Sequence, residues 1–255
     1  MAREGRSFRT PALILKRRNF DEADRLLTVL TPEHGKLDVI AKGARKATST
    51  KTGHVELFTV VDMLVSRGRT FHIVTQAEMK TPYLPLREDL QRGAYASYVA
   101  ELLDRFTMLG EDDFHTLYTL INETFQRLCE AEDPRLTTRY YEIRLLDMTG
   151  FRPELNQCVL TGETIQPEDQ FFSPAEGGVV SPAAARQTTN LLPITLGALK
   201  LLRHMQRSPY SQVYTLQITD LLHNEVERLL LSYIAYILES RLQSVNFIRR
   251  LRIKP

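Results

Sequence analysis

Three stretches near the N-terminus decide the fold: Asp24-Arg-Leu-Leu-Thr-Val-Leu-Thr31, Glu33-His-Gly-Lys36 and Ile40-Ala-Lys-Gly-Ala-Arg-Lys46. The first contains an apolar run of Leu, Val and Thr and predicts a strand. The second contains the glycine of a turn. The third begins as a strand and continues into a basic loop. A strand, a turn, a second strand and a cationic loop indicate a small β-barrel, a design that favours nucleic-acid binding over catalysis.

Further strands are predicted on both sides of these stretches. Ala12–Leu15 is a short apolar run, and Phe58–Ser66 and Thr70–Ala77 are rich in Val, Thr, Phe and Ile on either side of a predicted Arg67-Gly68 turn. Five strands before residue 80, without a helical pattern, predict a small closed or nearly closed barrel. The five-stranded OB-fold is the first candidate, and the pattern leaves an SH3-like barrel open.

The segment Gly43–Gly53 joins the third predicted strand to the fourth. It contains two glycines and several basic residues but no bulky apolar side chain. We expect that it does not contribute to a core, and that it is mobile in the free protein and becomes ordered when a ligand binds.

Beyond residue 80 the apolar spacing becomes helical. The predicted helices are Leu86–Leu109, Asp113–Cys129, one from Pro134 to Thr149-Gly150, one from a Thr195 cap to His204, and Asp220–Leu242. Residues 151–190 have little periodicity and many Pro, Gly and Ser residues. The sequence therefore predicts an α+β protein: a barrel domain over residues 1–80 and a helical domain over 81–255, into which 151–190 is inserted as a loop-rich lobe.

The composition is that of a globular protein, with 43% hydrophobic and 25% charged residues among 255. Leu229–Leu238 is about half as long as a bilayer span of roughly 20 residues, so we expect a buried helix and no membrane partner. No secretory signal is visible at the N-terminus. The only cysteines, Cys129 and Cys158, form no CxxC pair, which fits a reducing cytoplasm.

The net charge of +2 is unevenly distributed: residues 1–80 carry +6, residues 81–150 carry −6, and residues 151–255 carry +2. A basic segment followed by an acidic one predicts that the first binds a polyanion. The candidate contacts are cations at predicted strand ends and loops, where Lys and Arg can bind phosphates: Arg17, Arg18, Lys42, Arg45, Lys46, Lys51, Arg67 and Arg69. A solubilising surface is the alternative interpretation.

The sequence also contains candidate partners for base stacking. Phe20, Phe58, Phe71 and His72 are candidates, although Phe58 and Phe71 fit a core better. The basic stretch Arg249–Lys254 predicts a cationic C-terminal tail.

Catalysis has little support in the sequence. No P-loop, Rossmann or nucleophile-elbow motif is present, and none of the six histidines lies at metal-ligand spacing. Asp112-Asp113 and the acids at 130–133 fit helix ends, and Cys129 fits a packing position. We therefore expect a protein that is not an enzyme and uses no cofactor.

The stretch Leu13–Lys36, followed by Ala41-Lys-Gly-Ala-Arg-Lys46, resembles the N-terminal OB domain of the bacterial recombination mediator family RecO. The resemblance continues more weakly at Tyr141–Leu146, Gly150–Leu155 and Arg241–Phe247. It implies a cytoplasmic, nucleoid-associated DNA repair protein that binds single-stranded DNA and the single-stranded-DNA-binding protein SSB. It also implies that such a protein anneals strands and works with RecR to load RecA.

The resemblance also implies a small lobe that binds zinc through two CxxC pairs in many members. The matching positions here are Cys158-Val-Leu-Thr161 and Ser181-Pro-Ala-Ala184, so three of the four ligand positions are not cysteine. Since one thiolate cannot hold a structural zinc ion, we expect a degenerate zinc finger that folds without metal.

For the acidic C-terminal tail of SSB, the positions that match the family are Arg139 and Lys200. Duplex DNA is left open as a further ligand. Two other functions stay open at this point: a generic RNA- or ribosome-binding OB protein, which would prefer RNA through its 2′-hydroxyl, and an enzyme with a cryptic site.

Overall fold

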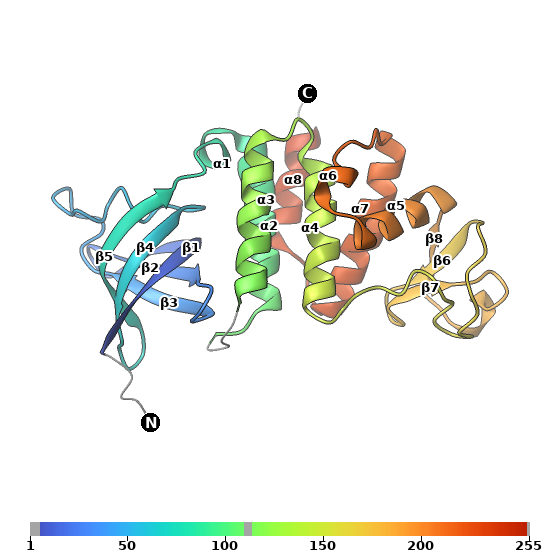
Figure 1. Ribbon diagram of the computed structural model, residues 1–255, viewed down its shortest axis with the longest axis horizontal. Coiled ribbons are helices and arrows are strands. Elements are labelled where there is room, and N and C mark those ends of the chain that lie inside the picture. Colours follow the sequence, from blue (N-terminus) through green and yellow to red (C-terminus); the bar gives the residue numbers. More distant parts are fainter. Residues whose placement is uncertain (1–5, 110–113, 254–255) are drawn as a thin grey trace. The chain divides into compact units, whose positions relative to one another are not determined.

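The computed structural model describes residues 6–109 and 114–253 of the chain (Figure 1). It divides into two compact units. The first contains Met1–Glu130 with Ser244–Pro255, and the second contains Ala131–Gln243.

The first unit begins with a closed five-stranded barrel. Its strands are β1 (Ser7–Phe20), β2 (Asp24–Leu30), β3 (Lys36–Ala41), β4 (Val60–Ser66) and β5 (His72–Thr81). They close in the order β1-β2-β3-β5-β4, with β3 and β5 parallel and the other pairs antiparallel. This arrangement confirms the predicted OB-fold.

Successive side chains of a strand point to opposite faces, so every second side chain points into the barrel and fills it. Ile14, Leu27, Val29, Val39 and Met63 are fully or almost fully buried inside it. In β3, Val39 and Ala41 lie in this core and Leu37 packs against it.

Two glycines fit the predicted turns for different reasons. Gly35 has a φ of +64°, in the left-handed region that disfavours other residues, and it closes the turn from Thr31. Gly68 lies in the β4–β5 turn, where a Cβ atom would approach the Phe71 carbonyl oxygen to 1.9 Å. A side chain at residue 68 would thus require the turn to change.

One expectation for the β3–β4 connection is wrong. Ala44 is fully buried and belongs to the barrel core, together with Val55. The absence of bulky side chains does not keep this segment out of the core, because the methyl group of alanine fits where a larger side chain would not.

In the described residues, four helices accompany the barrel: α1 (Pro85–Glu88), α2 (Leu90–Phe106), α3 (His115–Glu130) and α8 (Gln243–Ile253). The prediction of one helix over Leu86–Leu109 is wrong, because Asp89 has an extended backbone and ends α1. The Asp89 carboxylate then accepts a hydrogen bond from the Arg92 backbone N–H at 2.8 Å and caps α2. The helix predicted from Asp113 begins at His115, and Asp113 lies outside the described residues.

The second unit contains α4 (Pro134–Met148), α5 (Leu196–Arg207), α6 (Tyr210–Val213) and α7 (Asp220–Ile237). Its sheet has the order β7-β6-β8, formed by β6 (Gln170–Ser173), β7 (Gly178–Val180) and β8 (Leu192–Ile194), with the short 3₁₀ helix η1 (Ala185–Gln187) before β8. The predicted Thr195 cap is confirmed, since its hydroxyl accepts from the Ala198 backbone N–H at 3.2 Å.

The helix predicted over Asp220–Leu242 ends earlier than expected. α7 stops at Ile237, and Glu239 adopts a left-handed φ of +49° before α8 begins. Most of the basic stretch predicted as a tail is part of α8, and Lys254 lies outside the described residues. The apolar run is buried on one face of α7, at Leu229, Leu230 and Ile234, whereas Tyr236 on the same run is exposed. Among the helices that the structure describes, none has the length and apolar character needed to cross a membrane.

Candidate nucleic-acid interface

The eight predicted phosphate contacts all lie at strand ends or in connections of the barrel. Arg17 and Arg18 are near the end of β1, and Arg67 and Arg69 lie in the β4–β5 turn. The remaining cations, Lys42, Arg45, Lys46 and Lys51, lie in the β3–β4 connection.

Hydrogen bonds join the β3–β4 connection to the β1–β2 turn. The Gly43 backbone N–H donates to the Asp24 carboxylate at 2.7 Å, and the Arg45 backbone N–H donates to the Ala23 carbonyl oxygen at 2.9 Å. The Arg45 guanidinium also donates to the Glu22 carbonyl oxygen at 3.1 Å. These contacts bring cations of the connection next to the end of β1.

Arg17 belongs to a cluster that the sequence did not predict. Its guanidinium pairs with Glu56, and Arg25 pairs with the other oxygen of the same carboxylate at 2.9 Å. Two guanidinium groups thus share one carboxylate, and the cluster keeps one positive charge. Arg25 could have been found from the strand register, since it lies opposite Asn19 of β1 and Ala41 of β3.

Two other predicted cations have contacts within the protein. The half-buried Lys51 donates from its ammonium group to the Val74 carbonyl oxygen at 3.3 Å. The Arg67 guanidinium lies 5.1 Å from the centre of the Phe8 ring, a cation–π contact. Phe8 also contacts His72, whose pKa is lowered by burial and by the neighbouring Arg67 and His34 charges.

Four predicted cations remain available for a ligand. Arg18, Lys42, Lys46 and Arg69 are exposed, and within residues 6–109 and 114–253 none of them is paired with a carboxylate. A phosphate can therefore bind these side chains without breaking an ion pair of the protein. We call these four residues the free rim cations.

The candidate stacking residues fall into two groups. Phe58 is buried and packs edge-on against Phe125 of α3, as expected for a core residue. Phe20 and Phe71 are half-buried, and their ring centres lie 6.0 Å apart. This contact brings the β4–β5 turn close to the end of β1.

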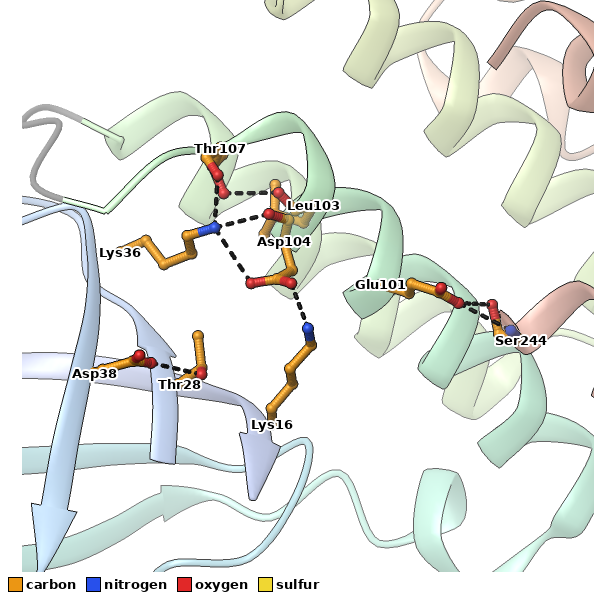
Figure 2. A network of polar contacts seen from close by, with 9 residues as sticks. All are labelled: Lys16, Thr28, Lys36, Asp38, Glu101, Leu103, Asp104, Thr107 and Ser244. Atoms are coloured by element: carbon orange, nitrogen blue, oxygen red, sulfur yellow. Dashed lines mark hydrogen bonds and ion pairs between the residues drawn. The ribbon is translucent and has the colours of Figure 1, made fainter. Parts of the chain in front are cut away.

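A cleft that the sequence did not predict opens between the outer surface of the barrel and α2. It has a volume of about 580 Å³. Its charged lining comprises the cations Lys16, Arg17, Arg18 and Lys36 and the carboxylates of Asp38, Glu101 and Asp104. Figure 2 shows its main polar network, in which the Asp104 carboxylate forms ion pairs with the ammonium groups of both Lys16 and Lys36.

Comparison with known proteins agrees with this architecture. The family model "Recombination protein O N terminal" matches residues 5–83, and "Recombination protein O C terminal" matches residues 87–245. The chain belongs to the RecO family. Among curated relatives, the DNA repair protein RecO of Roseiflexus sp. (strain RS-1) is 38% identical over 97% of this chain and 87% of its own length. That of Dehalococcoides mccartyi (strain ATCC BAA-2266 / KCTC 15142 / 195) is 34% identical over 91% of each chain.

The zinc site that the RecO resemblance implies does not fit the residues of this lobe. The buried Cys158 sulfur accepts a hydrogen bond from the Ser181 backbone N–H at 3.4 Å and lies 3.7 Å from the Ser181 hydroxyl oxygen. Ala184, at the fourth position, has no ligand atom. In the described part of the chain, no three His, Cys, Asp or Glu side chains form a group that could hold a metal ion.

Hydrogen-bond donors surround the Cys158 sulfur where a metal would otherwise bind. Burial opposes ionisation of this thiol, but hydrogen bonds from the Thr161 hydroxyl and from the backbone N–H groups of Ser181, Leu160 and Thr161 outweigh it and lower the pKa to about 6. In this RecO lobe, hydrogen-bond donors thus stabilise the Cys158 thiolate, as a bound zinc ion would.

The two positions matched to SSB binding differ in exposure. Lys200 is exposed on α5. Arg139 of α4 is 4% exposed and forms an ion pair with the buried Glu142 at 3.0 Å. A buried guanidinium in an ion pair is held inside the unit, so binding of a tail to Arg139 would first require this pair to open.

Proposed function

We propose that the chain is a mediator of DNA repair and homologous recombination, which binds single-stranded DNA along the rim of its barrel. The observation that carries this proposal is the set of free rim cations at a strand end and in the connections of an OB-fold. Membership of the RecO family supports it, since the curated relatives carry the name DNA repair protein. Strand annealing and RecA loading with RecR are part of the same proposal.

The chemistry of the rim suits binding without sequence preference. Lys and Arg bind phosphate oxygens, which are the same in every nucleotide, and such contacts release condensed counterions. The proposal includes no bond-making step, so the protein acts by binding and by arranging strands.

We also propose that Lys200 contributes to binding the acidic tail of SSB. Its exposed ammonium group can pair with a carboxylate without rearrangement. Lys200→Glu should then weaken binding of an SSB tail peptide, whereas Arg207→Glu, at an exposed cation in the last turn of the same helix, should leave it nearly unchanged. Equal losses in both variants would mean that the general charge of the second unit, and not Lys200, attracts the peptide.

The main test is fluorescence anisotropy of a labelled single-stranded oligonucleotide over a salt titration. Lys42→Gln/Lys46→Gln removes two free rim cations. The matched control, Arg9→Gln/Lys80→Gln, removes two exposed charges that pair with Asp62 and Glu78 on the same barrel. The rim variant should reduce the slope of log affinity against log salt by about 1.4, since single strands give roughly 0.7 for each phosphate contact.

Two results would contradict the proposal. If the wild-type protein binds no single-stranded DNA at low salt, the proposed function is refuted. If the rim and control variants lose the same affinity, the binding depends on the net charge of the barrel and not on the free rim cations. RNA and duplex DNA of the same sequence are measured in parallel. A strong preference for RNA would favour the function of a generic RNA-binding OB protein.

A further inference from the structure

The Lys36 side chain holds the end of α2 against the barrel. Its ammonium group donates to the carbonyl oxygens of Asp104 at 2.7 Å and Thr107 at 2.5 Å, and it lies 3.2 Å from the Asp104 carboxylate. The side chain is 8% exposed. Because the last carbonyl groups of a helix lack partners within the helix, Lys36 has a structural role there.

Lys16 contacts the same carboxylate from a very different environment. Its side chain is 54% exposed, and among the described residues Asp104 is its one ionic partner. Figure 2 shows Lys16 reaching Asp104 from the barrel, on the side of the carboxylate away from Lys36. Lys16 can therefore exchange this partner for another anion without uncovering a buried charge.

The other carboxylates of the cleft are engaged elsewhere. Asp38 accepts from the Thr28 hydroxyl at 2.6 Å, and Glu101 accepts from the Ser244 backbone N–H at 2.9 Å. Asp104 pairs directly with Lys16, an exposed cation of the cleft. Arg18, one of the free rim cations, also lines the cleft.

We propose that a phosphate of single-stranded DNA binds in this cleft between Lys16 and Arg18 and takes the place of the Asp104 carboxylate on Lys16. The cleft volume lies within the roughly 300–1,000 Å³ of sites for small ligands, enough for a phosphate and its sugar. Asp104 then acts as a built-in competitor that limits affinity for DNA. This inference rests on the proposed binding of DNA by the barrel.

The competition has a distinct salt signature. A phosphate that displaces a fixed carboxylate separates an existing ion pair, so Lys16 gains little on binding DNA. In Asp104→Asn the amide keeps the size of the side chain but not its charge, and Lys36 retains its two carbonyl acceptors. Lys16 binds the same phosphate in both proteins, so the number of released counterions is unchanged. The gain of Asp104→Asn should therefore appear as a higher affinity at every salt concentration, with a salt slope close to that of the wild type.

The test uses the full chain and a labelled single-stranded oligonucleotide. Asp104→Asn should raise affinity roughly two- to fivefold, the range of one exposed ion pair. Asp62→Asn makes the same charge change beside Arg9, and should change affinity much less. Lys16→Gln combined with Asp104→Asn should lose the gain, because the cation that Asp104 releases is then absent.

Each result separates this inference from the proposed function. A gain that persists in the Lys16→Gln background, an equal gain in Asp62→Asn, or no gain in Asp104→Asn would overturn the competition while leaving DNA binding by the rim intact. A wild-type protein that does not bind the oligonucleotide would instead refute the proposed function. Urea unfolding of each variant confirms that the compared proteins are folded.

Discussion

Two lysines that share one carboxylate allow a direct test of the role of burial. Lys36→Met and Lys16→Met each remove an ammonium group from Asp104 and keep a flexible apolar side chain. Lys36 is almost fully buried and makes charged hydrogen bonds to two backbone carbonyl groups, whereas Lys16 is half exposed. Lys36→Met also leaves the end of α2 without its partner.

The expected losses of unfolding free energy differ severalfold. Removing one partner of a buried, hydrogen-bonded ion pair costs about 3–5 kcal/mol. Removing an exposed partner costs about 1 kcal/mol or less. With a urea dependence of about 2 kcal/mol per molar, the midpoint should fall by about 1.5–2.5 M for Lys36→Met and by about 0.5 M or less for Lys16→Met.

The assay is urea unfolding followed by circular dichroism, with hydrogen exchange to locate the change. A chain with two compact units need not unfold in a single step, so the local measurement is needed. Exchange should accelerate most in α2 and β3 of Lys36→Met. Equal midpoints for the two variants, or faster exchange confined to the second unit, would refute the reasoning that the buried Lys36 contacts hold α2.

The remaining predictions concern the second unit. The thiolate absorbance of Cys158 in the folded protein should develop with a midpoint near pH 6 and should vanish in Cys158→Ser. Between about pH 6 and 9 the folded state binds fewer protons than the unfolded state, so the free energy of unfolding should rise with pH over this range. Asp133→Ala removes the N-cap of α4 and should cost about 1 kcal/mol in thermal unfolding at neutral pH. Burial raises the pKa of Asp133, but hydrogen bonds and charge from Arg135 outweigh this and lower it, so the difference between wild type and this variant should shrink as pH falls below the ordinary value of 3.8. Elemental analysis should find no stoichiometric zinc in the wild type, whereas Thr161→Cys/Ser181→Cys/Ala184→Cys should bind zinc; tightly bound zinc in the wild type would contradict the metal-free lobe.

Local features of the fold could be predicted well from the sequence. The glycine turns and the Thr195 cap each depend on a few neighbouring residues, and the structure has them where they were expected. Element ends were less accurate where a polar residue competes with the helix, as at Asp89. The Asp89 carboxylate stabilises the structure more as the N-cap of α2 than it would inside one continuous helix.

The candidate site could be predicted only in part. Position at predicted strand ends or in loops, together with positive charge, identified the free rim cations, because both are local properties. Which cations are already neutralised depends on partners far away in the sequence, such as Glu56 for Arg17 and Asp104 for Lys16. No local sequence pattern predicts such pairs. The cleft between the barrel and α2 could not be predicted either, because its lining comes from segments that are far apart in the sequence.

The anchored β3–β4 connection also limits where this loop can vary in length. Bonds from Gly43 and Arg45 fix its start, and the Thr52 hydroxyl, farther along the connection, donates to the Ala44 carbonyl oxygen at 3.0 Å. Residues inserted between Lys46 and Lys51 would extend a surface loop at little entropic cost. A single residue inserted between Gly43 and Ala44 would instead shift Arg45 out of register with Ala23, while Gly43 stays bonded to Asp24, and would pull Ala44 out of the barrel core.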